Sequence, residues 1–198
     1  MTDDSTLDGD FVSIPLDKWQ WHPSPLPGPV VLITTVDADG TPDVAPKSWF
    51  TVAAFTGPVL GFGCSEEHRT CRNIRATGQF TVNIPGVNLA EAIWRMPDAT
   101  DRFADAGLTT VPGKTIAVPS IRECHAHLEC ELDQIAEFKE GEVFIFGTVK
   151  LVEVHKAALT PADTTSQYTA LGTPLFFLED DWYAPLGQPR QVKPTPVT

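Results

Sequence analysis

The sequence predicts a mainly β protein, a small closed or half-open β-barrel with peripheral helices. Six or so apolar or β-branched segments follow one another with turns between several of them, as in successive hairpins. One helical segment is inserted after the third strand, and the chain has no internal repeat. Hairpins in this number, with a single early helix, favour a barrel of roughly six strands.

The first three predicted strands are residues 30–36, 44–55 and 59–64. The first is β-branched and apolar. The sequence Asp37-Ala38-Asp39-Gly40 follows it and is typical of a hairpin turn, because Gly40 can adopt a positive φ. The sheet is therefore expected to begin with a hairpin.

A helix is predicted over residues 66–77, immediately after the third strand. Ser65 is a suitable N-cap for it. Gly78 ends the helix, since glycine readily takes the left-handed conformation that closes helices. A fourth strand, residues 80–84, follows and ends before a proline.

The rest of the chain is predicted to be more irregular. Residues 11–29 are rich in Pro and Trp and are expected to pack over the core without regular structure. Two short helical segments, 89–96 and 102–106, lie in a long excursion between strands. The last predicted elements are a hairpin of strands 125–138 and 143–155 and a short strand at 175–178.

The composition restricts the possible partners. With 42% hydrophobic residues among 198, one domain with a substantial core is expected. A formal net charge of −12 would be repelled by nucleic acid and by anionic lipid, since both require basic surface. No apolar run approaches the length that spans a bilayer. We therefore expect neither nucleic acid nor a membrane as a partner.

The ends of the chain suggest its domain limits and location. Residues 1–10 are acidic and lack the basic start and apolar stretch of a signal peptide, which predicts a disordered tail on a cytoplasmic protein. A single domain over 11–187 and a Pro-rich tail over 188–198 are expected to follow. The cysteines have no C-x-x-C spacing, which favours free thiols in a reducing compartment. They are Cys64, Cys71, Cys124 and Cys130.

The start of the predicted helix is a candidate phosphate site. Arg69, Thr70 and Asn73 fall within about a third of the helix circumference. A guanidinium, a hydroxyl and a carboxamide beside the unpaired N–H groups of a helix start suit a phosphorylated small molecule. The alternative is an ordinary surface helix, whose Glu66 and Glu67 would repel an anion unless they point away.

A second cluster, from Cys124 to Cys130, has the composition of a metal site. On a strand, His125, His127 and Glu129 share one face, and the two cysteines share the other. A His-x-His pair can bind zinc or iron, as in cupins, but the cupin glycine pattern and carboxylate spacing are absent. Histidines on the outer face of a barrel strand are the preferred interpretation, and no metal is expected. Common catalytic signatures are also absent, so no catalytic residue is identified.

Tryptophan is the remaining candidate for binding a planar ligand. Any single one of the five is more easily explained as core. Trp49 is the exception, because it lies in Lys47-Ser48-Trp49-Phe50, where polar and aromatic residues mix within a predicted strand.

Several short motifs occur in the order found in a known family. They are Val30–Asp37 with Gly40, Pro42–Phe50, Arg69–Ile74, Gly78–Asn83, Phe103–Leu108, and Gly147–Val149 with His155 and Trp182–Gly187. Together they resemble the flavin reductase-like family of FMN-binding split-barrel proteins, over about Pro27 to Gly187. The chain departs from the family pattern at two positions: the usual Asp before Thr70 is missing, and Lys47 stands where an apolar residue is common.

The resemblance implies a homodimer with one FMN per subunit near the dimer interface. The FMN phosphate would lie on Arg69, Thr70 and Asn73. The isoalloxazine ring would lie along Ser48, Trp49 and Phe50 and at the end of the third strand, Cys64 and Ser65. A positive Lys47 near the N1–C2=O edge of the ring would stabilise reduced, anionic flavin, unless it lies on the outer face of its strand.

The resemblance also implies an activity. The expected protein is an NAD(P)H-dependent flavin reductase that passes electrons through FMN, with a monooxygenase as a possible recipient of reduced flavin. One alternative is an FMN-bound electron-transfer or flavin-storage protein without nicotinamide-dependent activity. Another is a β-barrel binding module without flavin.

Overall fold

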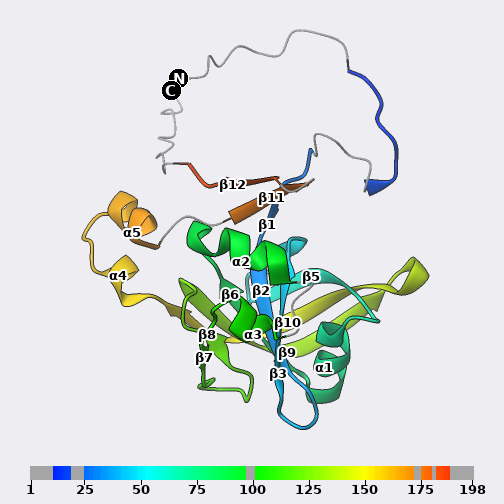
Figure 1. Ribbon diagram of the computed structural model, residues 1–198, viewed down its shortest axis with the longest axis horizontal. Coiled ribbons are helices and arrows are strands. Elements are labelled where there is room, and N and C mark those ends of the chain that lie inside the picture. The colour runs from blue at the N-terminus through cyan, green and yellow to red at the C-terminus, as the bar shows by residue number, and fades with distance from the viewer. Residues whose placement is uncertain (1–10, 19–24, 97–100, 172–174, 180–181, 188–198) are drawn as a thin grey trace.

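The computed structural model describes residues 11–18, 25–96, 101–171, 175–179 and 182–187. The predicted tails, 1–10 and 188–198, lie outside the described residues, so the domain limits stay a prediction. The described part is mainly β, with a large sheet and peripheral helices, which confirms the expected fold class (Figure 1).

Seven of the described strands form one antiparallel sheet, in the order β3-β2-β6-β9-β10-β5-β4. Five of them match predicted strands closely, and the β9–β10 hairpin is the longest pairing among the described strands. The bounds are β2 (Val31–Val36), β3 (Pro42–Lys47), β4 (Phe50–Ala54), β5 (Val59–Ser65), β6 (Gln79–Ile84), β9 (Ala126–Glu137) and β10 (Glu142–Val154).

The predicted second strand, 44–55, is wrong as a single element. It breaks at Ser48 and Trp49 into β3 and β4, which lie at opposite edges of the sheet. Trp49 O accepts a hydrogen bond from Gly63 N at 2.9 Å, so the chain has already joined β5 before β4 begins. Because β3 also approaches β5, the sheet curls. Ser48 and Trp49 therefore connect its two edges.

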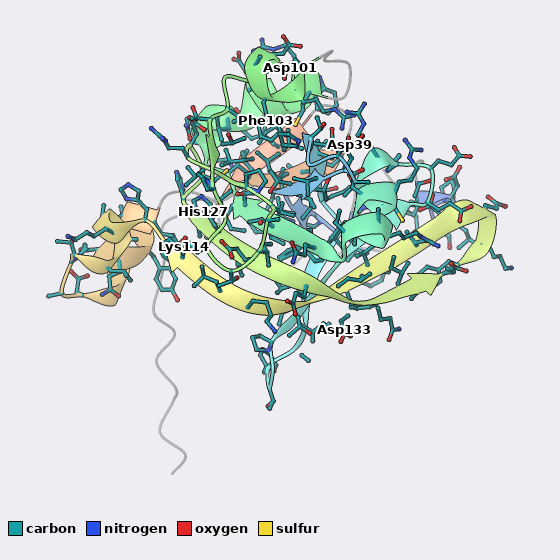
Figure 2. All side chains as sticks on the ribbon, turned by 90° about the horizontal axis from the view of Figure 1, so that it is seen from below. Asp39, Asp101, Phe103, Lys114, His127 and Asp133 are labelled. Carbon is teal, nitrogen blue, oxygen red and sulfur yellow. The ribbon has the colours of Figure 1, made fainter. Side chains whose placement is uncertain are left out.

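Helix α1 (Arg69–Thr77) begins three residues later than predicted. Ser65 does not cap it: the Ser65 hydroxyl accepts from Glu67 N at 3.3 Å and closes a turn before the helix, whose N-cap is His68. The predicted end is confirmed, because Gly78 has φ 70° and its N–H donates to Ile74 O at 2.8 Å. In Figure 2, α1 lies on one face of the β9–β10 hairpin and Asp133 points from the other.

The main core lies between α1 and the curled sheet. Phe62 and Phe80 meet edge to face, with ring centroids 5.5 Å apart, and Cys71 and Ile74 of α1 pack into the same cluster. A second cluster forms where Leu32 and Val44, on the opposite face, meet the 89–108 excursion and Leu175. Burial of both faces of β2 explains its unbroken apolar and β-branched sequence.

The other elements cover the sheet and its ends. Helices α2 and α3 were predicted, but the two helices after β10, α4 and α5, were not. The sequence of α5 lacks the strong apolar stripe by which a helix is recognised. The bounds are β1 (Gly28–Pro29), η2 (Val87–Leu89), α2 (Ala90–Arg95), α3 (Arg102–Asp105), β7 (Thr110–Val111), β8 (Ser120–Ile121), η4 (Lys139–Gly141), α4 (Lys156–Leu159), α5 (Thr164–Leu171), β11 (Leu175–Glu179) and β12 (Trp182–Pro185).

The first and last described strands form a separate small sheet. In it, β11 pairs with β1 on one side and with β12 on the other, antiparallel in both cases. Figure 1 shows this sheet stacked beyond α2, at the opposite end of the molecule from α1. The irregular segment expected at 11–29 therefore contributes one short strand, although residues 19–24 lie outside the described residues.

Two further sequence expectations can be compared with the fold. All four cysteines lie in the described part of the chain and are free, as predicted; the structure adds that all four are buried. Across the same ranges, no helix combines the length and the apolar character needed to cross a bilayer.

Candidate functional site

Three side chains meet where β3 ends, β5 ends and α1 begins. Lys47 Nζ lies 3.3 Å from His68 Nδ1, and Cys64 Sγ lies 3.8 Å from the same nitrogen. Successive side chains of a strand point to opposite faces, so Asp43, Ala45 and Lys47 of β3 share one face, the face that α1 covers. Lys47 therefore points toward the start of α1 and not to an outer face.

Burial and charge keep this cluster in defined protonation states. Burial and then the adjacent Lys47 lower the pKa of His68, so its ring is neutral at pH 7 and Nδ1 can accept a hydrogen bond from the ammonium group. Burial raises the pKa of the Cys64 thiol, and the opposing effect of Lys47 is smaller. Cys64 is therefore a neutral thiol, and Lys47 is the cation of the cluster.

Ser48 lines a cavity, and the neighbouring Trp49 is partly exposed. Ser48 and Lys47 line a cavity of about 170 Å³ together with Pro46, and Ile93 and Trp94 of α2 form part of its wall. Trp49 is 42% exposed, and its ring covers Gly63 so closely that a Cβ there would lie 2.8 Å from the ring. Trp49 is thus not a core residue.

Phe50 and Ser65, two other residues predicted to lie along the flavin ring, make contacts that support the fold. Phe50 packs against the main core and pairs with Phe62 across β4 and β5. Ser65 is half-buried at the end of β5, where its hydroxyl closes the turn before α1. Ser65 directly follows Cys64 in β5, and Phe50 packs against the core cluster to which Cys64 belongs.

The three residues predicted to hold a phosphate do not share one exposed surface. Arg69 is exposed, and its Nη1 donates to Asp43 Oδ1 at 3.1 Å. Thr70 and Asn73 are buried against the sheet, and Asn73 Nδ2 donates to Thr35 Oγ1 of β2 at 2.9 Å. The helical stripe that groups them is the stripe that packs on β2 and β3, so Arg69 is the member that solvent can reach.

A larger apolar cavity of about 400 Å³ adjoins the cavity beside Ser48. The two cavities share Val30, Ile93, Trp94 and Phe177 as lining residues. Trp94 and Phe177 stack with ring centroids 6.2 Å apart and an interplanar angle of 25°. Tyr183 of β12 completes the aromatic lining.

Sequence reasoning missed His68, Trp94 and Phe177 as site residues. His68 had a local signal, because it directly precedes the helix start and lies one turn after Cys64. Trp94 and Phe177 had none, since they come from distant segments that meet only when β11 packs against α2.

Two residues of the His and Glu cluster, His127 and Glu129, hold a loop of the protein. His127 Nε2 lies 2.7 Å from Ile121 O, and Glu129 accepts from Lys114 N and Thr115 N, both at 2.7 Å. Residues 114–121 return over this face, so the expectation that it is an outer face is wrong. Within the described ranges, no three His, Cys, Asp or Glu residues are grouped to hold a metal.

The sequence matches a family model described as the flavin reductase like domain, over residues 24–177. An uncharacterized protein from Methanothermobacter thermautotrophicus is 30% identical over 163 residues, which cover 79% of this chain and 76% of that protein.

Two solved structures have the same fold. The 2-nitrobenzoate 2-nitroreductase NbaA of Pseudomonas fluorescens superposes with a TM-score of 0.79 at 23% identity, covering 91% of each chain. Component B of nitrilotriacetate monooxygenase from Bacillus cereus has a TM-score of 0.79 at 23% identity, covering 92% of this chain and 100% of that one.

Proposed function

The chain belongs to the flavin reductase like family, and we propose from that membership that it binds FMN and reduces it with NADH or NADPH. The family makes the protein a flavin-dependent oxidoreductase, and FMN, as the group bound, would supply the hydride and electron chemistry. What remains for the chain itself is to bind the flavin, orient it and set its electrostatic environment.

The residues at the start of α1 fit a flavin ring. Ser48 and the half-exposed Trp49 offer a hydroxyl and an aromatic face, and Cys64 and Ser65 border the same region from β5. Lys47 supplies a cation beside a neutral histidine. In this proposal Lys47 approaches the N1–C2=O edge, where positive charge favours the anionic reduced flavin, and Phe50 supports the strand behind it.

The observation that supports the reductase assignment is that two cavities lie side by side and share four lining residues. The cavity beside Lys47 and Ser48 shares Trp94 and Phe177 with the aromatic cavity that Tyr183 also lines. A planar second reactant bound there would lie next to a ring placed on Ser48. We assign this position to the nicotinamide donor or to the molecule that accepts electrons from reduced FMN.

Two partners are proposed on separate grounds. A second copy of the chain is one, because β4 is an edge strand with an exposed Val52 and an exposed Phe55 follows it. A monooxygenase that consumes reduced flavin is the other, and the similar protein from Bacillus cereus, a monooxygenase component, supports it.

The first experiment is the absorbance spectrum of the purified protein, followed by titration with FMN. Bound flavin absorbs in the visible, and binding is expected to quench flavin fluorescence with micromolar or tighter affinity. Steady-state oxidation of NADH and of NADPH with added FMN then tests the reductase. Flavin binding without nicotinamide oxidation would favour an electron-transfer or storage protein, and absence of flavin binding would overturn the proposal.

A further inference from the structure

The apolar cavity of about 400 Å³ is walled by two elements that the fold brings together, α2 and the small sheet of β11 and β12 (Figure 1). Ala90, Ile93 and Trp94 are three and four residues apart, so they share one side of α2. From the small sheet, the lining residues are Leu175, Phe177 and Tyr183. The cavity therefore has a helix on one side and a sheet on the other.

Three aromatic rings meet in this cavity. Phe177 and Tyr183 are directly opposite in the β11–β12 pairing, so their side chains are neighbours on one face of the sheet. The Trp94 ring is 25° from parallel with the Phe177 ring, and Trp94 and Tyr183 are 54% and 47% exposed. Aromatic faces that solvent can reach are available for stacking with a planar molecule.

The charged residues of the lining offset each other. Glu91 and Arg95 are one turn apart on α2, with Arg95 Nη1 3.9 Å from Glu91 Oε2, and both side chains are mostly exposed. Among the described lining residues, Arg95 is the only cation. Because the whole chain carries a formal charge of −12, an anionic ligand gains little electrostatic free energy here. The cavity therefore favours an uncharged occupant.

Size and charge also distinguish between the two reactants that this position could take. A volume of about 400 Å³ is ordinary for a small-molecule site. A nicotinamide dinucleotide carries two phosphates, and for these the described lining offers only Arg95, which is already paired with Glu91. An uncharged ring system needs no such partner, so the lining suits the electron acceptor better than the nicotinamide donor.

We propose that the aromatic cavity is the site of the electron acceptor, and that this acceptor is an uncharged, planar molecule of the quinone class with one or two fused rings. The inference rests on the proposed function. NADH or NADPH gives up a hydride, which carries two electrons and one proton, solvent supplies a second proton, and the quinone leaves as the hydroquinone. The ring of the quinone stacks on the exposed faces of Trp94 and Tyr183.

Calorimetric titration of the full-length protein, saturated with FMN, tests the site with two probes: a naphthoquinone and the same molecule carrying a sulfonate. The wild type should bind the uncharged probe more tightly. Ala90→Leu fills part of the cavity and Tyr183→Ala removes one ring, so each should weaken binding of the uncharged probe by at least about fivefold. Neither residue lines the cavity beside Ser48, so the affinity for FMN should change less than about twofold.

Glu91→Gln tests the charge balance, because it leaves Arg95 without its partner. Its affinity for the sulfonate should rise by about threefold, while that for the uncharged probe should not change. Phe138→Ala is the matched control for Tyr183→Ala, since Phe138 is 65% exposed and does not line the cavity. Its affinities for both probes should equal those of the wild type.

Three results would overturn the acceptor assignment while FMN binding stands. One is an affinity for the uncharged probe that is unchanged in folded Ala90→Leu and Tyr183→Ala. Another is tighter binding of the sulfonate than of the uncharged probe by the wild type. The third is loss of NADH binding, but not of quinone binding, in these two variants, which would assign the cavity to the donor. Wild-type protein that binds no FMN would overturn both proposals.

Discussion

Lys47 is the only cation in contact with both His68 and Cys64 among the described residues, so it sets the charge of the proposed ring site. A unit charge about 5 Å from the flavin, at an effective dielectric constant near 20, contributes about 3 kcal/mol before screening. Because solvent screens a partly exposed charge, about a third of that free energy should remain, which shifts the midpoint potential of a two-electron couple by on the order of 20 mV. Lys47→Met should therefore lower the FMN midpoint potential by that amount.

The potential of Lys47→Met should be measured at pH 8. The substitution removes one cause of the lowered pKa of His68, but burial still lowers it, and pH 8 lies above the ordinary value of 6.5, so the imidazole is neutral in both proteins. Lys150→Met is the control, because Lys150 pairs with Glu131 on the hairpin. An unchanged potential in Lys47→Met, with FMN still bound, would contradict a role for Lys47 at the ring.

Glu129 is a second residue whose ionisation has a measurable consequence. Burial opposes its charge, but hydrogen bonds from Thr115 and Lys114 lower its pKa below the ordinary value of 4.5. A lowered folded-state pKa stabilises the protein above the unfolded pKa, and that stability is lost as pH falls through the folded-state value. Glu129→Gln should cost about 1–3 kcal/mol at pH 7, and the difference from wild type should shrink below pH 4.

Urea unfolding at pH 7 and at pH 3.5 measures this difference. Glu131→Gln serves as the control, because the exposed Glu131 carboxylate forms a surface ion pair with Lys150, so its effect should be within about 0.5 kcal/mol at either pH. A Glu129→Gln deficit that is the same at both values of pH would rule out linkage to the Glu129 carboxylate.

At the scale of an element, the end of α1 depends on one backbone conformation. Gly78 has φ 70°, and no atom lies within 4 Å of where its Cβ would be, so the cost of Gly78→Ala is conformational and not steric. We expect a loss of about 1 kcal/mol in the free energy of unfolding. Gly187→Ala, also in open space but without a positive φ, should be neutral, and equal losses in both would exclude the helix end as the cause.

Most elements were predictable because each carries a local signal. The hairpin turn at Asp37–Gly40, the helix end at Gly78 and the β9–β10 hairpin all rest on neighbouring residues. The break at Ser48 and Trp49 had no such signal, since both halves of 44–55 have strand character and the break follows from the sheet curling back onto β5. The late start of α1 has a local cause, the turn that Ser65 closes, which competes with helix capping.

The candidate site was predictable only in part. Periodicity grouped Arg69, Thr70 and Asn73, but periodicity does not say whether a stripe faces solvent or a sheet, and here β2 covers two of the three. Arg102 lies 33 residues beyond Arg69 in the printed sequence, and the two meet only because both reach Asp43. Contacts of that kind depend on the fold as a whole.

At the scale of the whole molecule, we expect a homodimer that covers β4. Sedimentation at micromolar concentration should give twice the chain mass. Val52→Lys places a charge on the exposed edge strand and should shift the protein toward monomer, while Val154→Lys, on the partly exposed β10, should not. A wild-type monomer that binds FMN tightly would mean that one chain completes the flavin site.

The two-residue connection of β3 to β4 also bears on how the chain folds. These strands are consecutive in sequence but lie at opposite edges, so the β2–β3 and β4–β5 hairpins become part of one sheet only when β6, β9 and β10 lie between them. The β5–β10 ladder, which pairs Val59 with Thr148, closes a long loop and is entropically slow to form. The local hairpins should therefore form early. The connection at Ser48 and Trp49 should take its final position last, so that the proposed ring site is among the last parts of the protein to assemble.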